Sequence, residues 1–181
     1  MKLLYGVNCM VDLETLDTTS WAVIRSIGAC IFCRDGVVRT FYQNVDAASC
    51  SALGMSTSPE TLQWWEAQPA DAKAALETDK VPLKQALERF SQWYGRNSLP
   101  TWSNGSDFDN AILQSAFKCV GLPCTWKFWD NRCIRTARAL FPKSTKPFDG
   151  VKHNALDDAV NQAKELIDLD RQLRTLTNHK D

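Results

Sequence analysis

Apolar stretches in the first quarter of the chain predict three β-strands, over residues 3–12, 21–32 and 37–44. Residues 34–36 read Arg-Asp-Gly, which is typical of a hairpin turn between the second and third strands. Because the connections are short, these strands are expected to form an antiparallel meander.

From Ser58 onward, apolar residues recur at the spacing of amphipathic helices. Ser58 is a predicted N-cap, and Pro59 suits the first helical position. In chain order, the pattern predicts helices over 59–68, 70–76, 82–94, 109–120, 131–140 and 154–176, with short strands over 99–103 and 124–128. This alternation predicts an α/β fold in which helices cover a mixed sheet.

The length and composition fit one globular domain, with 181 residues, 44% hydrophobic and 23% charged. We expect a single domain over 1–176 and a frayed tail over 177–181. No apolar stretch approaches the ~18 residues that span a bilayer. Residues 1–10 are interpreted as the start of the first strand rather than a signal peptide, so no membrane contact is expected.

The chain has seven cysteines, an odd number without a compact disulfide framework, which predicts reduced thiols and a cytoplasmic location. Cys30 and Cys33 form a C-x-x-C pair, which Cys119 and Cys124 would complete as a zinc site. The alternative is that Cys30 and Cys33 act as small hydrophobic residues inside a strand, and their apolar neighbours favour it.

The net charge is zero, so no global field attracts a polyanion. Residues 127–152 are nevertheless basic, with an excess of cationic over acidic side chains. The cationic residues are Lys127, Arg132, Arg135, Arg138, Lys143, Lys146 and Lys152, and the acidic ones are Asp130 and Asp149. This stretch is either a solvated face or a rim that contacts phosphates.

The candidate chemistry begins with Asp12 and Glu14 in the sequence M-V-D-L-E-T. In a strand, both carboxylates face the same way, and they repel each other unless a cation lies between them. Hard oxygen ligands of this kind suit a divalent metal. A solvated pair at a strand terminus is the alternative, which D-x-E alone does not exclude.

A histidine and further acids lie where the predicted layout can bring them to the same place. Asp109 follows a predicted strand in the sequence F-D-N, and Asp158 follows His153 by five residues in H-N-A-L-D-D-A. Asp107 and Asp157 are the neighbouring acids that these two motifs leave out.

With these motifs, the chain resembles the DEDDh, or DnaQ-like, 3′–5′ exonucleases. The resemblance covers nearly the whole domain and rests on stretches that occur in order: M-V-D-L-E-T at 10–15, S-I-G-A at 26–29, T-L-Q-W-W-E-A-Q at 61–68, S-N-G-S-D-F-D-N at 103–110, F-W-D-N-R-C-I-R-T at 128–136 and H-N-A-L-D-D-A at 153–159. Finer features resemble phage exodeoxyribonuclease A and relatives described as exodeoxyribonuclease VIII-like or 3′–5′ exoribonuclease-like. The implied fold is ribonuclease H-like, with a central mixed five-stranded sheet (three antiparallel strands, then parallel additions) flanked by helices.

The resemblance implies a two-metal phosphodiester hydrolysis that releases nucleoside monophosphates from 3′ ends, expected to be those of single-stranded DNA. Asp12, Glu14, Asp109 and Asp158 would hold two Mg²⁺ or Mn²⁺ ions about 3.5–4 Å apart. His153 would be the general base that takes a proton from the attacking water. An ordinary imidazole pKa of about 6.5 suits that role. The expected location is a bacterial or phage-infected host cytoplasm.

The resemblance also implies substrate contacts at Thr15, Leu16, Trp65, Asn110 and Arg135. Leu16 would wedge under the terminal base, although relatives carry a glycine shortly after E-T where this chain has Leu-Asp-Thr. Of the adjacent residues Trp64 and Trp65, one could stack a base while the other joins the core. Cys133 stands where relatives often carry an acid.

Two other functions stay open. An exoribonuclease uses the same chemistry, and no residue identifies a group that reads the 2′-hydroxyl. A catalytically silent binding protein could share the fold, but all the acids and the histidine of the motif are present. Relatives include homodimers, and no motif decides the oligomeric state.

Overall fold

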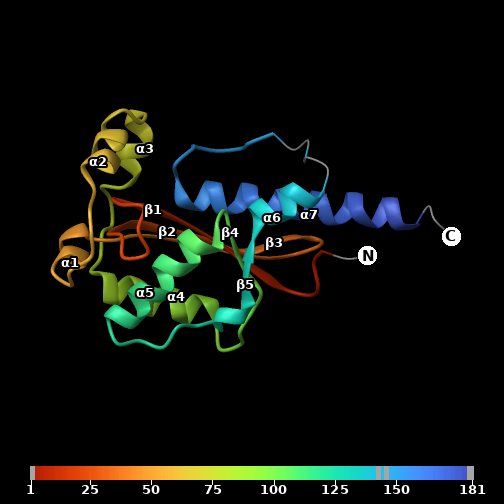
Figure 1. Ribbon diagram of the computed structural model, residues 1–181, viewed down its shortest axis with the longest axis horizontal. Helices are drawn as coiled ribbons and strands as arrows, with labels where there is room; N and C mark the ends of the chain where they lie inside the picture. The colour runs from red at the N-terminus through yellow and green to blue at the C-terminus, as the bar shows by residue number, and fades with distance from the viewer. Residues whose placement is uncertain (1–2, 142–143, 145–146, 179–181) are drawn as a thin grey trace.

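The computed structural model describes residues 3–141, 144 and 147–178, and it is built around one five-stranded sheet (Figure 1). The strands are β1 (Asn8–Thr15), β2 (Ile24–Cys33), β3 (Gly36–Asn44), β4 (Thr101–Ser103) and β5 (Asn131–Cys133), in the spatial order β3-β2-β1-β4-β5. Adjacent strands among β1, β2 and β3 are antiparallel, whereas β4 and β5 run parallel to β1. The predicted mixed sheet is therefore confirmed.

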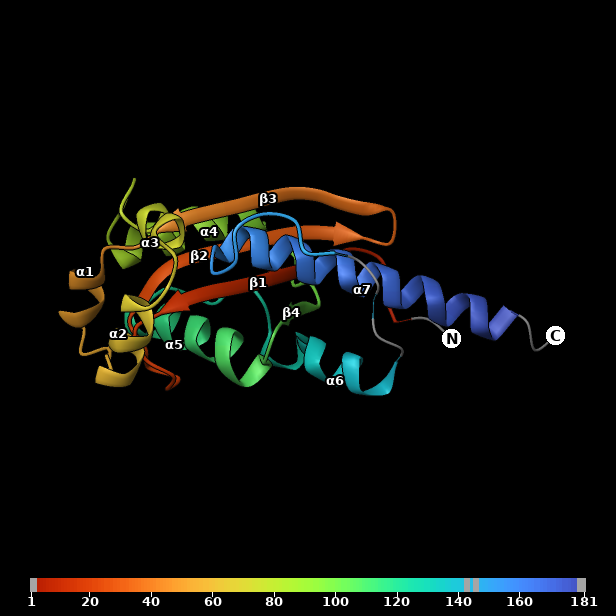
Figure 2. The same ribbon diagram turned by 90° about the horizontal axis from the view of Figure 1, so that it is seen from above.

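Helices cover both faces of this sheet. They are α1 (Ala47–Ser51), α2 (Pro59–Glu66), α3 (Ala70–Ala75), α4 (Leu83–Tyr94), the π-helical turn η1 (Ser106–Asn110), α5 (Ala111–Cys119), the 3₁₀ turn η2 (Phe128–Asp130), α6 (Ile134–Leu140) and α7 (Ala155–Asn178). In Figure 1, α6 and α7 lie on one side of the sheet and α4 and α5 on the other. Figure 2 shows α7 running lengthwise over β1 and β2.

The alternation along β1 explains why two cores form. Cys9, Val11 and Leu13 join the core beneath α4 and α5, whereas Met10 joins the core beneath α6 and α7. Because side chains two residues apart share a face, Asp12 and Glu14 fall on the α7 side with Met10. The strand thus directs its acids toward the last helix.

Gly28 on β2 permits the close approach of α7. A Cβ atom at this position would lie 2.0 Å from the backbone carbon of Ala155, which is far inside van der Waals contact. Ala155, Ala159 and Ala163 are fully buried along the same helix. Small residues on both elements therefore seat the start of α7 directly against the sheet.

The structure corrects several predicted boundaries. The first strand begins at Asn8 and continues to Thr15, so both acids lie within it, whereas the predicted strand ended at Asp12. The second begins at Ile24 instead of residue 21. Helix α7 continues to Asn178, beyond the expected end at 176. Residues 179–181 of the expected tail lie outside the described residues.

The largest correction concerns residues 124–140. The predicted strand over 124–128 is wrong, because Trp126 is buried against Phe90, Tyr94 and Phe117 from a loop. The fifth strand is β5, whose residues pair with β4, so the helix predicted from residue 131 begins only at Ile134. Tertiary pairing decided this register, which local periodicity does not report.

Two expectations based on composition can also be compared with the structure. Cys30 is fully buried, and its thiol donates to the carbonyl of Ala159, whereas the thiol of Cys119 donates to Leu53. Across the described part of the chain, no group of three or more potential metal ligands contains a cysteine. None of the described helices has the length and apolar character needed to cross a membrane.

Candidate active site

The side chain of Asp12 on β1 is hydrogen-bonded to the last helix, α7. Its Oδ1 atom accepts a hydrogen bond of 2.7 Å from Nε2 of Gln162 on α7. The pKa of Asp12 is raised well above its ordinary value, first by desolvation and then by the nearby charges of Asp109, Glu14 and Asp158. The acids predicted from separate motifs therefore lie within one another's electrostatic field.

Asp109 reaches the site from η1, the turn that follows β4. Its side chain is 3% exposed, and its Oδ1 atom accepts a 3.0 Å hydrogen bond from the backbone N–H of Leu13. Burial raises the pKa of Asp109 to about 7, against the opposing effects of hydrogen bonds and the charge of Arg135. The sequence placed Asp109 at a helix start, but it lies in a π-helical turn before α5.

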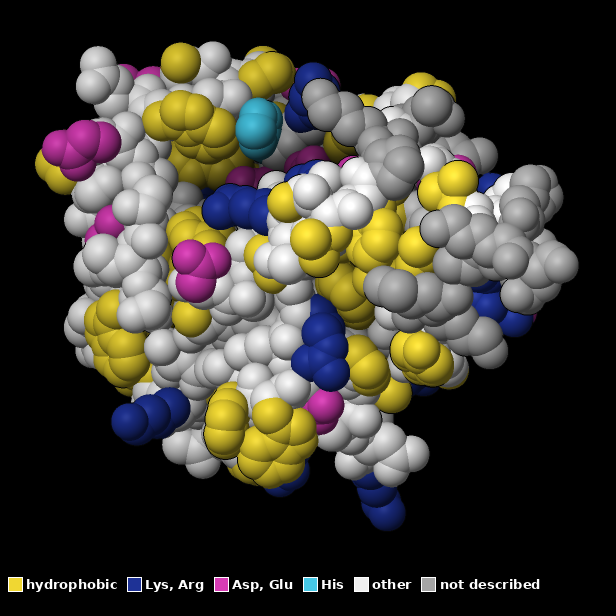
Figure 3. All heavy atoms as spheres, turned by 45° about the vertical axis from the view of Figure 1, so that its right-hand side comes forward, with side chains coloured by type: hydrophobic (Ala, Val, Ile, Leu, Met, Phe, Trp, Pro, Cys, Tyr) yellow, Lys and Arg dark blue, Asp and Glu magenta, His cyan; other side chains and the backbone are white. Residues whose placement is uncertain are grey.

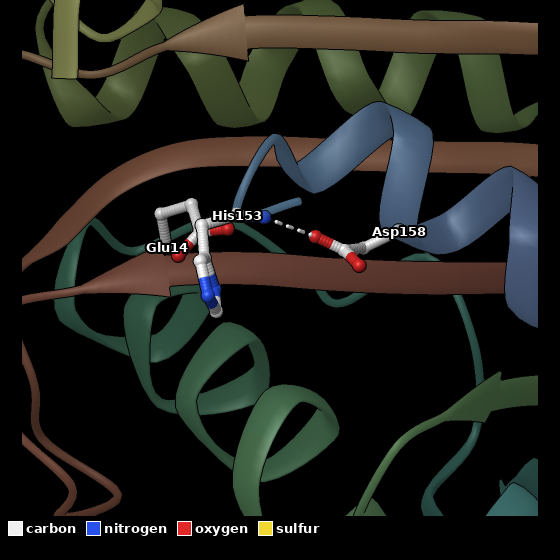
Figure 4. Close-up of side chains that lie close together, drawn as sticks. All are labelled: Glu14, His153 and Asp158. Carbon is white, nitrogen blue, oxygen red and sulfur yellow. Dashed lines mark hydrogen bonds between the residues drawn. The ribbon is translucent and has the colours of Figure 1, made fainter. Parts of the chain in front are cut away.

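His153 and Asp158 meet at the start of α7. His153 adopts a positive φ of 63°, and its backbone N–H donates a 2.8 Å hydrogen bond to Oδ2 of Asp158. Potential ligand atoms of Glu14, His153 and Asp158 all lie within 4.8 Å of one another. Figure 4 shows Glu14 beside His153, whose backbone N–H points to the carboxylate of Asp158.

Burial of these acids creates an electrostatic demand for a cation. Glu14 is 7% exposed, and its pKa rises from 4.5 to about 8 through desolvation and the charges of Asp158 and Asp109. The pKa of Asp158 is also raised, mainly by desolvation. Bound cations would offset this repulsion and hold all the carboxylates in the ionised form.

The donor set fits a hard divalent cation. Asp12, Glu14, Asp109 and Asp158 offer only carboxylate oxygens, the ligands that Mg²⁺ and similar ions prefer. Beside them, Oε1 of Gln162 is buried and has no hydrogen-bond partner among the described residues. Such an acceptor suits a place next to metal-bound water. A divalent metal is thus the cofactor that these residues can hold.

The two neighbouring acids lie differently. Asp107 is exposed on η1. The Oδ2 atom of Asp157 accepts a 2.8 Å hydrogen bond from the backbone N–H of Val151, so this carboxylate holds the loop before α7. Of the adjacent acids Asp157 and Asp158, it is Asp158 whose carboxylate lies with Glu14 and His153.

The structure places most of the expected substrate contacts inside the protein. Leu16 is 7% exposed and belongs to the core beneath α4 and α5. Trp65 is 6% exposed and donates a 2.8 Å hydrogen bond from Nε1 to the carbonyl of Thr15. Asn110 is fully buried and donates to Thr101. In this conformation these residues shape the turn around the carboxylates and offer little surface to a substrate.

Arg135 and Trp64 are the residues of this group that face outward. Arg135 is exposed, and its guanidinium lies over Gly105 next to η1, where an added Cβ atom would lie 3.2 Å from the guanidinium carbon. Trp64 is 43% exposed, and its ring meets the His153 imidazole edge to face at 4.9 Å. Trp64, rather than Trp65, therefore borders the site.

Sequence reasoning missed the role of Gln162. This residue follows Asp158 by four positions on α7, so both side chains lie on one face of the helix. That spacing was the available signal. The partner of Gln162 is Asp12, which lies 150 positions away in the chain, and only the fold brings it near.

Residues 7–168 match the family model described as the 3′–5′ exoribonuclease Rv2179c-like domain. The chain belongs to this family. It is a 3′–5′ exonuclease, which acts on nucleic acid. No curated protein sequence matches the chain.

Solved structures share the fold of this Rv2179c-like domain. The nuclease domain of 3′hExo, a DEDDh family member bound to rAMP, is 16% identical with a TM-score of 0.61, covering 97% of this chain and 95% of that one. A ssDNA complex of E. coli ExoI is 14% identical with a TM-score of 0.62, covering 96% of this chain but only 42% of that one. The cell-death related nuclease 4 is 14% identical with a TM-score of 0.61, covering 94% of this chain and 64% of that one. The chain thus spans nearly all of the first structure and less than two thirds of the other two.

Proposed function

We propose that this Rv2179c-like domain is a divalent-metal-dependent hydrolase that removes nucleoside monophosphates from the 3′ ends of RNA, with Mg²⁺ or Mn²⁺ as the cofactor. The observation that carries the proposal is the convergence of Glu14, His153 and Asp158 within 4.8 Å, beside the buried Asp12 and Asp109. The family description, an exoribonuclease, favours RNA. Single-stranded DNA, the substrate expected from the motifs, is the alternative.

The residues of the site have separate roles in the proposed hydrolysis. Asp12, Glu14, Asp109 and Asp158 bind the cations, which when bound activate water and stabilise charge on the leaving 3′-oxygen. His153 accepts the proton of the attacking water at a ring nitrogen. The bond from its backbone to Asp158 fixes the turn that presents the imidazole. Arg135, exposed near Asp109, supplies positive charge for the phosphate.

The experiment compares RNA, single-stranded DNA and duplex DNA, each labelled at the 5′ end, under the same Mg²⁺ concentration. We expect RNA to be shortened stepwise from its 3′ end, with mononucleotide as product and complete inhibition by EDTA. Asp12→Ala should abolish the reaction. Asp107→Ala removes an exposed acid from the same region and should leave it intact.

Shortening from the 5′ end, or full activity in EDTA, would contradict the proposal. Faster degradation of DNA than of RNA would make DNA the preferred substrate, and the proposed metal-dependent hydrolysis would be unchanged. Sedimentation of the purified chain measures the homodimer that the family resemblance leaves open.

A further inference from the structure

An exposed aromatic pair lies on η2, the turn that leads into β5. Phe128 is 72% exposed and Trp129 is 62% exposed, and their ring centroids lie 4.9 Å apart at an interplanar angle of 75°. Neither ring belongs to the two hydrophobic cores. The pair therefore presents aromatic surface to solvent without contributing to either core.

The backbone beneath this pair is firmly anchored. Nη1 of Arg132 donates to the carbonyls of Trp129, at 2.8 Å, and Asn131, at 2.9 Å. Oδ1 of Asn131 accepts a 2.7 Å hydrogen bond from Nε1 of the buried Trp126. These bonds fix the turn on both sides, so the outward direction of the two rings is set by the fold.

Positive charge surrounds the pair and continues toward the active site. Lys127 precedes it, Arg132 follows it, and Arg135 lies beyond β5, against the single acid Asp130 in this stretch. Figure 3 shows Lys and Arg side chains interspersed with hydrophobic side chains on one face of the molecule. Aromatic rings among cationic side chains are the usual platform for single-stranded nucleic acid, because every base offers a face for stacking.

Strand register gives the separation between this pair and the carboxylates. Asn131 on β5 pairs with Thr101 on β4, and Thr101 pairs with Cys9 on β1. Cys9 lies three residues before Asp12. The rise of these three residues along β1, the two spacings from β1 to β5, and the length of the 3₁₀ turn together give roughly 20 Å between η2 and Asp12. A single strand held at the carboxylates by its 3′ end would cover this distance with about four nucleotides, within the usual size of a stacking site.

We propose that Phe128 and Trp129 form a second nucleic-acid contact, on which bases about four nucleotides upstream of the bound 3′ end stack. This inference rests on the proposed function, because it takes the 3′ end to lie at the carboxylates. The platform holds the strand between successive cleavages, and its contribution grows with substrate length.

The test measures binding of 5′-fluorescein RNA by anisotropy in EDTA, which removes cleavage from the measurement. Oligonucleotides of about three and about twelve nucleotides separate contacts at the site from contacts at the platform. Trp129→Ala and Phe128→Ala should each weaken binding of the longer RNA by about 10-fold, which is the effect expected when one base loses its stacking partner. Binding of the short RNA, and its rate of hydrolysis in Mg²⁺, should not change.

Val38→Ala is the matched control, because Val38 is 64% exposed on β3 at the opposite edge of the sheet. Equal loss for both RNA lengths, or no loss for the longer one, would overturn the platform. A change in sedimentation without a change in RNA binding would identify the pair as a protein contact and would also overturn it. Absence of 3′ shortening by the unaltered chain would instead refute the proposed function, whatever the anisotropy shows.

Discussion

The buried carboxylates should make the metal-free protein lose stability as the pH rises. Glu14 has an ordinary pKa of 4.5 in the unfolded chain and about 8 in the folded one. The folded state therefore binds more protons between these values, and stability falls as pH increases. The stability associated with protonated Glu14 is fully present below pH 4.5 and is lost as pH rises through about 8.

The size of this effect follows from the two pKa values. Each pH unit above 4.5 costs about 1.4 kcal/mol until the folded-state pKa is reached. At pH 7 the metal-free protein has thus lost about 3 kcal/mol of the stability that protonated Glu14 gives it below pH 4.5. For a chain of this length, that corresponds to roughly 10 °C in melting temperature.

Glu14→Gln removes the titrating group and keeps a similar shape. In EDTA at pH 7, we expect the variant to melt roughly 10 °C above the unaltered protein, with the difference shrinking toward pH 5. With saturating Mg²⁺ the difference in melting temperature should shrink or change sign, because the variant has lost a metal ligand. Thermal unfolding followed by circular dichroism, from pH 5 to pH 8, measures both.

Glu88→Gln, an exposed substitution on α4, is the control and should melt as the unaltered chain does at every pH. If Glu14→Gln melts below the unaltered protein in EDTA at pH 7, the carboxylates are not in electrostatic conflict. The argument for a cation at this site would then lose its physical basis.

Three further substitutions test how the site is assembled. His153→Ala should lower turnover by about 10² to 10⁴ with an unchanged melting temperature, and near-normal turnover would remove the imidazole from the reaction. Asp158→Asn should weaken the Mg²⁺ dependence of activity more than Asp157→Asn does, because of these two carboxylates it is that of Asp158 that lies beside Glu14. Titration of activity against Mg²⁺ measures this, and a larger effect of Asp157→Asn would contradict it. Gly28→Ala should destabilise the fold by about 1–3 kcal/mol and reduce activity, since its Cβ would push α7 outward; a normal melting temperature would contradict that close contact.

Local geometry explains what the sequence determined by itself. The period of two along a strand places Asp12 and Glu14 on one face wherever that strand packs, and the exact strand ends do not alter this. The spacing between His153 and Asp158 likewise spans one turn at a helix start, so their hydrogen bond needs only local chain. The resemblance carried by the motifs also predicted the five-stranded mixed sheet, although the fifth strand lies at Asn131–Cys133 and not over 124–128.

Contacts between distant segments decided the rest. Trp64 and Trp65 are equivalent in the sequence, and only packing buries one and leaves the other beside His153. The loop around Trp126 looked like a strand because burial alone produces the same apolar signal. Gln162 finds Asp12 only once α7 lies on β1. Periodicity reports which face of an element is apolar. It does not report which surface covers that face, because this depends on the assembled fold. The fold therefore decides which charges are buried and which rings are exposed.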